Sequence, residues 1–137
     1  MLKECDIGVV LIGSADKNDA RNPFSLEQRK KMIEDVFRGE QRLVIGSNID
    51  LQDPFADDAQ WDILLGSCVM SLTGRLPDVI YAADDYTVEW KRVTATVKKY
   101  PRFGDVRGTV IRELIRADRE SDVRNMVPPE VIASITH

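Results

Sequence analysis

The chain has 137 residues, which fits one domain that can bury a sizeable core. Its hydrophobic content of 43% and charged content of 31% are those of an ordinary soluble protein. The formal net charge of −4 argues against a general polyanion-binding surface, so nucleic acid is not an expected partner. No apolar run approaches the ~20 residues that span a bilayer, and no signal peptide is expected. Cys5 and Cys68 lie in apolar patterns rather than at metal-ligand spacing, which predicts buried, reduced thiols in a cytoplasmic protein without a membrane partner.

The first predicted elements are a strand, a polar loop and a capped helix. Residues 7–12 form an almost continuous apolar run, typical of a strand that is buried on both faces of a parallel sheet. After a loop over residues 13–24, Ser25 and Gln28 have the spacing of a capping box. A loop that opens from the carboxyl end of such a strand into a helix is where open α/β sheets bind ligands. One face of the helix is apolar, with Leu26, Ile33, Val36 and Phe37.

The remaining elements continue an alternation of strands and helices. Residues 42–47 and 77–83 read as strands, and residues 61–72 as an amphipathic helix that Gly74 closes. A short helix around Trp90 precedes an edge strand over residues 93–97, and further helices begin near Gly108 and Pro129. Residues 2–5 read as the last turn of a helix. This order predicts an α/β protein with four or five largely parallel strands and helices on both faces.

An acidic loop follows the second predicted strand. Asp50, Asp53, Asp57 and Asp58 crowd it, and such loops serve more often as solvated turns and helix caps than as metal sites. We therefore predict no protein-bound metal site.

Two motifs resemble those of the nicotinamide-nucleotide adenylyltransferases. Residues 13–15 (Gly-Ser-Ala) and 22–33 resemble the family's Gly-Ser-Ala and Asn-Pro-Phe-Thr-x-x-Glu-Arg-x-x-Met-Ile signature, with Ser25 in place of threonine and Gln28 in place of glutamate. Residues 106–112 resemble the Ile-Ser-Gly-Thr-x-Ile-Arg motif that contacts ATP phosphates in the same superfamily, with Arg107 in place of serine. With the matching element order, the likeness covers nearly the whole chain.

The resemblance implies a fold and an activity. The fold is a Rossmann-like open parallel sheet with helices on both faces, here over a single domain of residues 1–137. The activity is transfer of the adenylyl group from ATP to nicotinamide mononucleotide, which gives NAD and pyrophosphate, with Mg²⁺ accompanying the ATP.

The phosphate-binding residues implied by the resemblance are Gly108, Thr109 and Arg112, together with Arg107, and Arg112 is the candidate catalytic residue. The residue types fit this role, because a helix N-terminus attracts phosphate and a guanidinium can hold two phosphate oxygens. A glycine-threonine pair is also a plain capping sequence. The candidate substrate-binding residues are Ser14, Asn22, Phe24, Arg29 and Trp61. Trp61 is either a core anchor or a stacking surface for nicotinamide.

One family motif is missing from the sequence. The family's first strand carries Gly-x-x-x-Pro-x-His-x-Gly-His, whereas the one histidine of this chain is His137. The chain is therefore expected to be N-terminally incomplete, as a fragment or a mis-started version of a longer protein, or to have abandoned the chemistry. Loss of a central strand leaves exposed inner edges, which favour a homo-oligomer.

Three alternatives remain open for the function. The first is a nucleotidyltransferase for another phosphate-bearing substrate, such as phosphopantetheine. The second is a catalytically incomplete remnant that binds nucleotide without turnover, as the absence of His-x-Gly-His indicates. A flavodoxin-like interaction domain is the third, and the paired motifs disfavour it.

Overall fold

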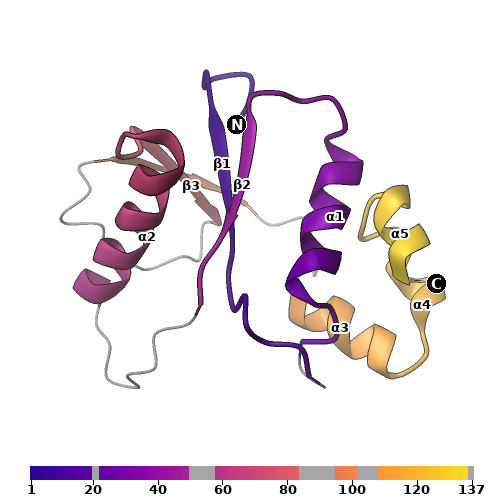
Figure 1. Ribbon diagram of the computed structural model, residues 1–137. Helices are drawn as coiled ribbons and strands as arrows, with labels where there is room; N and C mark the ends of the chain where they lie inside the picture. The colour runs from indigo at the N-terminus through magenta and orange to yellow at the C-terminus, as the bar shows by residue number, and fades with distance from the viewer. Residues whose placement is uncertain (20–21, 50–57, 84–94, 102–107, 136–137) are drawn as a thin grey trace. The chain divides into compact units, whose positions relative to one another are not determined.

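A computed structural model describes residues 1–19, 22–49, 58–83, 95–101 and 108–135 (Figure 1). The protein is mixed α/β, with small parallel sheets and helices. Its chain divides into two compact units, each made of two separate stretches of sequence. One unit comprises Met1–Ala15 and Arg42–Arg102, and the other comprises Asp16–Gln41 and Phe103–His137.

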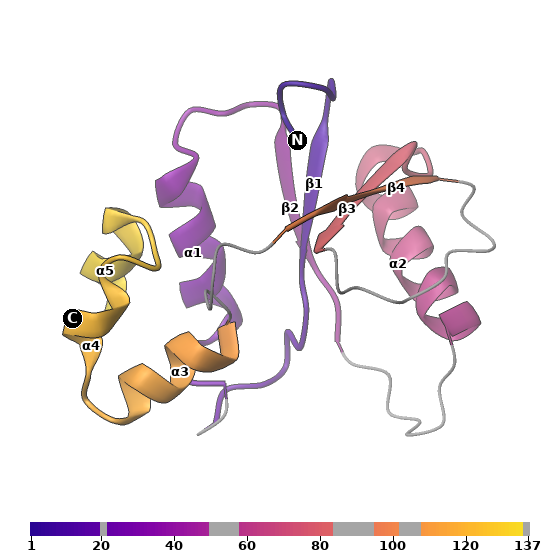
Figure 2. The same ribbon diagram turned by 180° about the vertical axis from the view of Figure 1, so that it is seen from behind.

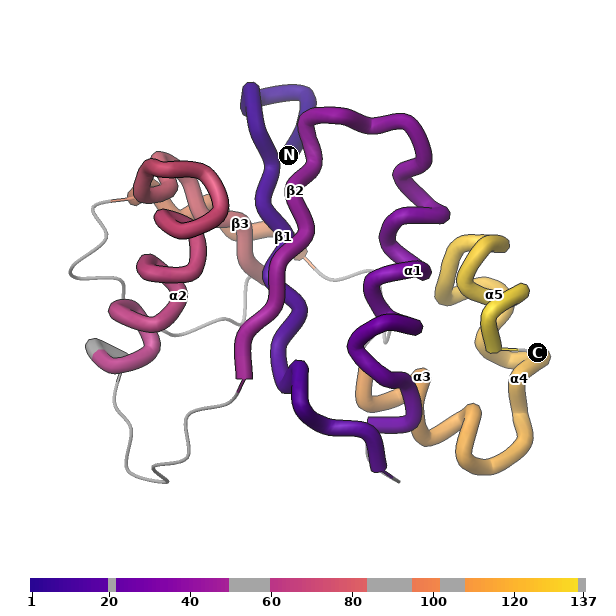
Figure 3. The backbone as a smooth tube through the Cα atoms, in the orientation of Figure 1, coloured from indigo at the N-terminus to yellow at the C-terminus, as the bar shows by residue number. Residues whose placement is uncertain are grey.

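The first strand pair joins β1 (Gly8–Ile12) to β2 (Leu43–Ser47) in parallel. The two strands run side by side in Figure 3. The hydrogen bonding continues past the ends of the strands, since Asn48 N donates to Ile12 O at 3.0 Å and Ala15 N donates to Asn48 O at 3.1 Å. The predicted strands over residues 7–12 and 42–47 are therefore confirmed to within one residue at each end.

The second strand pair joins β3 (Val79–Ala83) to β4 (Thr96–Tyr100), also in parallel. Strand β4 begins later than the predicted edge strand, part of which lies outside the described residues, as does Trp90. Pairing rather than alternation decides its position, because Tyr81 lies opposite Lys98 and stacks on Tyr100 with ring centroids 5.8 Å apart.

The four described strands form two sheets and not the one sheet that the sequence predicts. Strand β1 pairs with β2 and strand β3 with β4, and no strand of the described residues joins β1 to β3. The prediction of one sheet of four or five strands is thus not met by these residues. Hydropathy identifies each strand separately, but it does not say which strands become neighbours.

Helix α2 (Asp58–Thr73) belongs to the same unit as the four strands and contacts β2. Gly46 of β2 makes this contact possible, because a Cβ at this position would collide with the side chain of Leu72. The helix ends as predicted at Gly74, which has a φ of 76° and donates its N–H to Met70 O at 2.8 Å.

The other unit contains the helices α1 (Leu26–Val36), α3 (Gly108–Arg116), α4 (Glu120–Val123) and α5 (Pro129–Ile135). Helix α1 packs on α5, and α3 packs on α4. Among the described residues of this unit, the buried apolar side chains are Met32 of α1 and Val123 of α4. Phe37, which the sequence places on the packing face of α1, is instead 47% exposed, because the helix ends there and Phe37 forms its C-cap.

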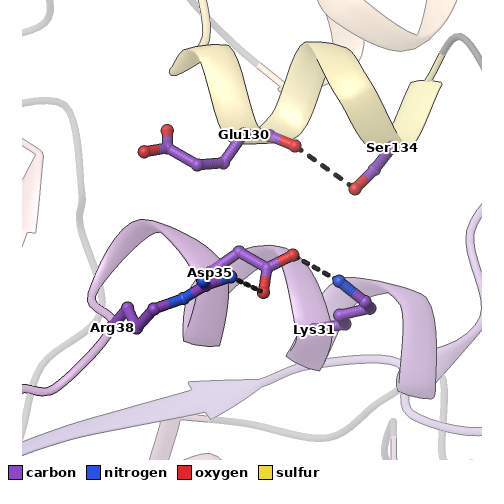
Figure 4. A network of polar contacts seen from close by, with 5 residues as sticks. All are labelled: Lys31, Asp35, Arg38, Glu130 and Ser134. Carbon is purple, nitrogen blue, oxygen red and sulfur yellow. Dashed lines mark hydrogen bonds and ion pairs between the residues drawn. The ribbon is translucent and has the colours of Figure 1, made fainter.

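Ion pairs run along α1 rather than between α1 and α5 (Figure 4). Asp35 accepts from Lys31 one turn before it and from Arg38 at 3.4 Å, and Ser134 Oγ donates to Glu130 O at 3.3 Å within α5. The hydrogen bond and charge of Lys31, followed by those of Arg38, lower the pKa of the Asp35 carboxyl below its ordinary value. Among the five residues drawn, no dashed contact joins α1 to α5.

Three further features concern the N-terminal turn, the thiols and the length of the helices. Residues 2–5 form a single turn closed by Glu4 N and Met1 O at 3.0 Å, so the predicted helical end is wrong. Cys5 and Cys68 are free thiols and are half-buried rather than fully buried. Within the described ranges, no helix combines the length and the apolar character that a membrane crossing requires.

Candidate functional site

The start of α3 brings three predicted phosphate-binding residues together. Arg112 lies one turn after the helix start, and its side chain folds back over that start. Its Nη2 donates to Thr109 Oγ1 at 3.5 Å, and its Nη1 lies 3.1 Å from where a Cβ of Gly108 would stand. The missing side chain of Gly108 thus leaves room for the guanidinium. Gly108 and Thr109 are exposed and Arg112 is half-buried, so a ligand can reach this end of the helix.

This arrangement can bind an anion for two reasons. The first amides of a nine-residue helix have no partner inside the helix, and they lie at the positive end of its dipole. The guanidinium adds a full positive charge and a planar set of donors, which match phosphate oxygens. Arg107, the fourth predicted phosphate-binding residue, lies outside the described residues.

Ser14 stands at the carboxyl end of β1, where the candidate substrate loop begins. It adopts a φ of 49°, an unusual conformation for a residue with a side chain. The next residue, Ala15, is tied to the end of β2 through the hydrogen bond to Asn48 O. The turn at Ser14 is therefore fixed by backbone pairing and directs the chain away from the sheet. Ser14 lies in the unit that contains the strands.

Asn22 closes a small loop with Asp19. Its backbone N and its side-chain Nδ2 both donate to Asp19 Oδ1, at 3.0 Å and 3.1 Å, and Asp19 N donates to Asn22 O at 2.9 Å. One amide hydrogen of the Asn22 side chain is thus used in the contact with Asp19. The part of Asp19 in this contact is not predicted from the sequence, although aspartate is a common turn-forming residue.

Phe24 and Arg29 flank the start of α1. Ser25 caps the helix as predicted, since Gln28 N donates to Ser25 Oγ at 3.1 Å and Ser25 N donates to Gln28 Oε1 at 2.8 Å. Arg29 Nε donates to Ser25 O at 3.3 Å, which holds the base of the guanidinium against the first turn. Phe24 is half-buried just before the cap.

The candidate residues divide between the two units of the chain. Ser14 and Trp61 belong to the unit that contains the strands, and the other described candidates belong to the unit that contains α1 and α3. Within the latter unit, Figures 1 and 2 both draw the first turn of α3 next to the first turn of α1.

Trp61 lies in the first half of α2 and is half-buried. This degree of burial is compatible both with a core anchor and with a stacking surface, so both interpretations of Trp61 remain. The next residue, Asp62, is fully buried at 0% exposed, and the sequence analysis did not single it out. The signal in the sequence is an aspartate next to a tryptophan in an apolar helix. Such a position is informative because aspartate is almost never fully buried unless it is paired.

The expectation of Mg²⁺ raises the question of which side chains could hold a metal ion. The described residues contain no group of three or more histidine, cysteine, aspartate or glutamate side chains placed to hold a metal ion. Most of the acidic loop, residues 50–57, lies outside the described ranges.

Comparisons with known proteins leave the family open. No protein-family model matches the chain, and no curated protein matches its sequence. The adenylyltransferase resemblance therefore depends on the two motifs and on the local geometry that they adopt.

Proposed function

We propose that the chain is a nucleotidyltransferase-like domain that binds the phosphates of ATP at the start of α3 and transfers the adenylyl group to nicotinamide mononucleotide. The observation that carries this proposal is the position of Arg112. A guanidinium that contacts Thr109 Oγ1 and lies next to Gly108, at an exposed helix start, provides several donors for one polyanion. We include in this proposal a Rossmann-like arrangement of the strands.

The reaction needs positioning and charge neutralisation rather than a nucleophilic side chain. A phosphate oxygen of nicotinamide mononucleotide attacks the α-phosphorus of ATP, a new phosphorus–oxygen bond forms, and the bond to the bridging oxygen of pyrophosphate breaks. The amides at the start of α3 and the Arg112 guanidinium would hold the leaving phosphates and offset the charge that develops on them. Mg²⁺ would supply further charge neutralisation on the triphosphate.

The candidate substrate residues have separate roles in this proposal. Arg29, at the start of α1, is a cation for the phosphate of the mononucleotide, and Phe24, just before the same helix, offers aromatic surface to its ring. Asn22, in the same unit, contributes a polar side chain. Ser14 and Trp61 belong to the unit that contains the strands and stay separate candidates. These assignments follow the motif resemblance, and the capped start of α1 supports them by fixing the backbone that carries Phe24 and Arg29.

A second function is favoured by the absence of His-x-Gly-His from the sequence. A phosphate site without the histidine pair would bind nucleotide and release it unchanged. Removal of one preorganised donor costs about 3 kcal/mol of transition-state stabilisation in other enzymes, so the loss of two would leave little turnover.

The test combines calorimetry with a coupled assay of NAD formation on the same preparation. We expect Mg²⁺–ATP to bind the wild-type chain, and Arg112→Met to weaken this binding about 10- to 100-fold, because a charge-assisted hydrogen bond is lost. Arg116→Met, at the last turn of the same helix, is the matched control and should leave the affinity unchanged. Turnover would support the transferase, and binding without turnover would support the second function. Absence of ATP binding, or equal loss in both variants, would contradict both functions.

A further inference from the structure

Residues 1–5, which precede β1, make contacts far away in the sequence, on both strand pairs. On the β1–β2 side, Arg42 Nη1 donates to Leu2 O at 2.8 Å. Gly8, the first residue of β1, is buried, and a Cβ at this position would lie 2.5 Å from Met1 Cε and 2.9 Å from Leu2 Cδ2. The side chains of Met1 and Leu2 therefore cover the start of β1.

The same segment is bound to the β3–β4 pair through Glu4 and Cys5. Tyr81 Oη donates to Glu4 Oε2 at 2.6 Å, and Lys98 Nζ donates to the same oxygen at 2.9 Å. Cys5 Sγ lies 3.4 Å from Tyr81 Oη. Because the Tyr81 hydroxyl hydrogen is directed to Glu4, the thiol donates to the Tyr81 oxygen. Register explains the cluster, since Tyr81 and Lys98 lie opposite each other on adjacent strands.

We propose that residues 1–5, here called the N-terminal strap, form a releasable clamp that joins the two strand pairs. Glu4 of the strap bonds to β3 and β4, Leu2 bonds to Arg42, and the side chains of Met1 and Leu2 contact β1. A single turn from Met1 to Glu4 connects these contacts. Most of its polar anchors lie on the surface. Glu4 and Lys98 retain 47% and 40% of their side-chain exposure, so water competes for each contact. Release of the strap uncovers the backbone of Gly8 at the start of an apolar strand.

The charges in the cluster agree with this geometry. The hydrogen bond from Tyr81, followed by the hydrogen bond and charge of Lys98, lowers the pKa of Glu4. Glu4 raises the pKa of Lys98 in turn, and contacts with Cys5 and Glu4 raise the pKa of Tyr81. Glu4, Lys98 and Tyr81 therefore keep, at neutral pH, the protonation states that their hydrogen bonds require.

Alkylation of Cys5 measures how often the strap opens. In a Cys68→Ser background Cys5 is the only thiol of the chain, and its reaction with iodoacetamide can be followed by mass spectrometry. We expect Tyr81→Phe to raise the labelling rate about 5- to 10-fold, because the two contacts of the hydroxyl are lost. Lys98→Met should raise it about 2- to 5-fold, as for one exposed ion pair, and Lys98→Arg should restore the wild-type rate.

Two controls separate strap release from general loosening. Lys99→Met changes the neighbouring, exposed lysine of β4, and it should leave the labelling rate of Cys5 unchanged. In the matched Cys5→Ser background, the labelling rate of Cys68 in α2 should be the same with and without Tyr81→Phe. The proposal is overturned if Tyr81→Phe and Lys98→Met leave the rate of Cys5 unchanged, if Lys99→Met raises it equally, or if Cys68 becomes reactive to the same extent.

Discussion

The starts of α1 and α3 present the same backbone groups to different partners. At α1, the amides are satisfied from within, because Ser25 and Gln28 exchange two hydrogen bonds across the first turn. At α3, Gly108 and Thr109 are exposed, and the side chain that approaches them is the cationic Arg112, which offers no acceptor to an amide. The comparison shows that a helix start becomes a candidate anion site through the side chain that lies over it.

The two helix starts should also differ in the ligand that each binds. The loss of ATP binding in Arg112→Met is the reference for this comparison. We expect Arg29→Met at α1 to weaken binding of nicotinamide mononucleotide about 10-fold and to leave the ATP affinity within about 2-fold. The reason is that each guanidinium contacts a different phosphate in our proposal. Calorimetry with each ligand alone would measure this. Equal loss of both ligands in either variant would show that the two starts form one undivided site.

Removal of the α1 cap should affect stability rather than ATP binding. Ser25→Ala leaves the amide of Gln28 without its acceptor and should lower the free energy of unfolding by about 1 kcal/mol. Chemical denaturation followed by circular dichroism would measure the change. Ser71→Ala, at an exposed position inside α2, is the control and should cause no loss of stability. A drop in ATP affinity in Ser25→Ala would mean that the capped start also contributes to the phosphate site.

Addition of a methyl group at α3 should disturb the phosphate site only slightly. In Gly108→Ala the new Cβ lies 3.1 Å from Arg112 Nη1, so the guanidinium has to shift by a few tenths of an ångström. We expect ATP affinity to fall about 3-fold, since site groups work only close to their productive position. In the Arg112→Met background the same substitution should have no further effect. Full additivity of the two changes would show that Gly108 acts independently of Arg112.

The smallest expected effect is a change in the pKa of Asp35 in α1. Lys31 lowers the pKa of Asp35. The contact therefore stabilises α1 at pH values above 3.8, the ordinary pKa of this carboxyl group, and the stabilisation is lost as the pH falls through the lowered pKa. Lys31→Met should move the Asp35 pKa upward, as measured by a carboxyl NMR titration. Lys30→Met removes a looser pair with Glu34, 3.9 Å apart, and should leave the titration of Asp35 unchanged. If the pKa of Asp35 does not change in Lys31→Met, Arg38 and not Lys31 lowers it.

Most elements of the fold could be predicted because their causes are local. The apolar runs at β1, β2 and β3, the Ser25 capping box and the Gly74 helix end each depend on residues within one turn or one strand. Predictions that depended on the course of the backbone were less successful. Residues 2–5 are predicted as the last turn of a helix but form one isolated turn. Phe37 continues the apolar face of α1 in the sequence, but the helix ends before it and its side chain stays exposed.

The candidate site was predictable as a set of residues but not as a geometry. Motif resemblance selected Gly108, Thr109 and Arg112, and only the structure shows the guanidinium folded back over the first turn. Asp62 was missed because amphipathic spacing draws attention to apolar positions, and the burial of a carboxylate depends on its three-dimensional surroundings.

By itself, the sequence determined the type and approximate position of most helices and strands, but not the short helix α4, since hydrogen bonds within a turn and side-chain periodicity act over a few residues. Tertiary structure alone decided which strands pair and what joins the pairs. Glu4 meets Tyr81 and Lys98 across 77 and 94 residues of sequence, and no local pattern marks these partners. The reason is physical, because contacts at such separations depend on the fold of the intervening chain and not on the preferences of neighbouring residues.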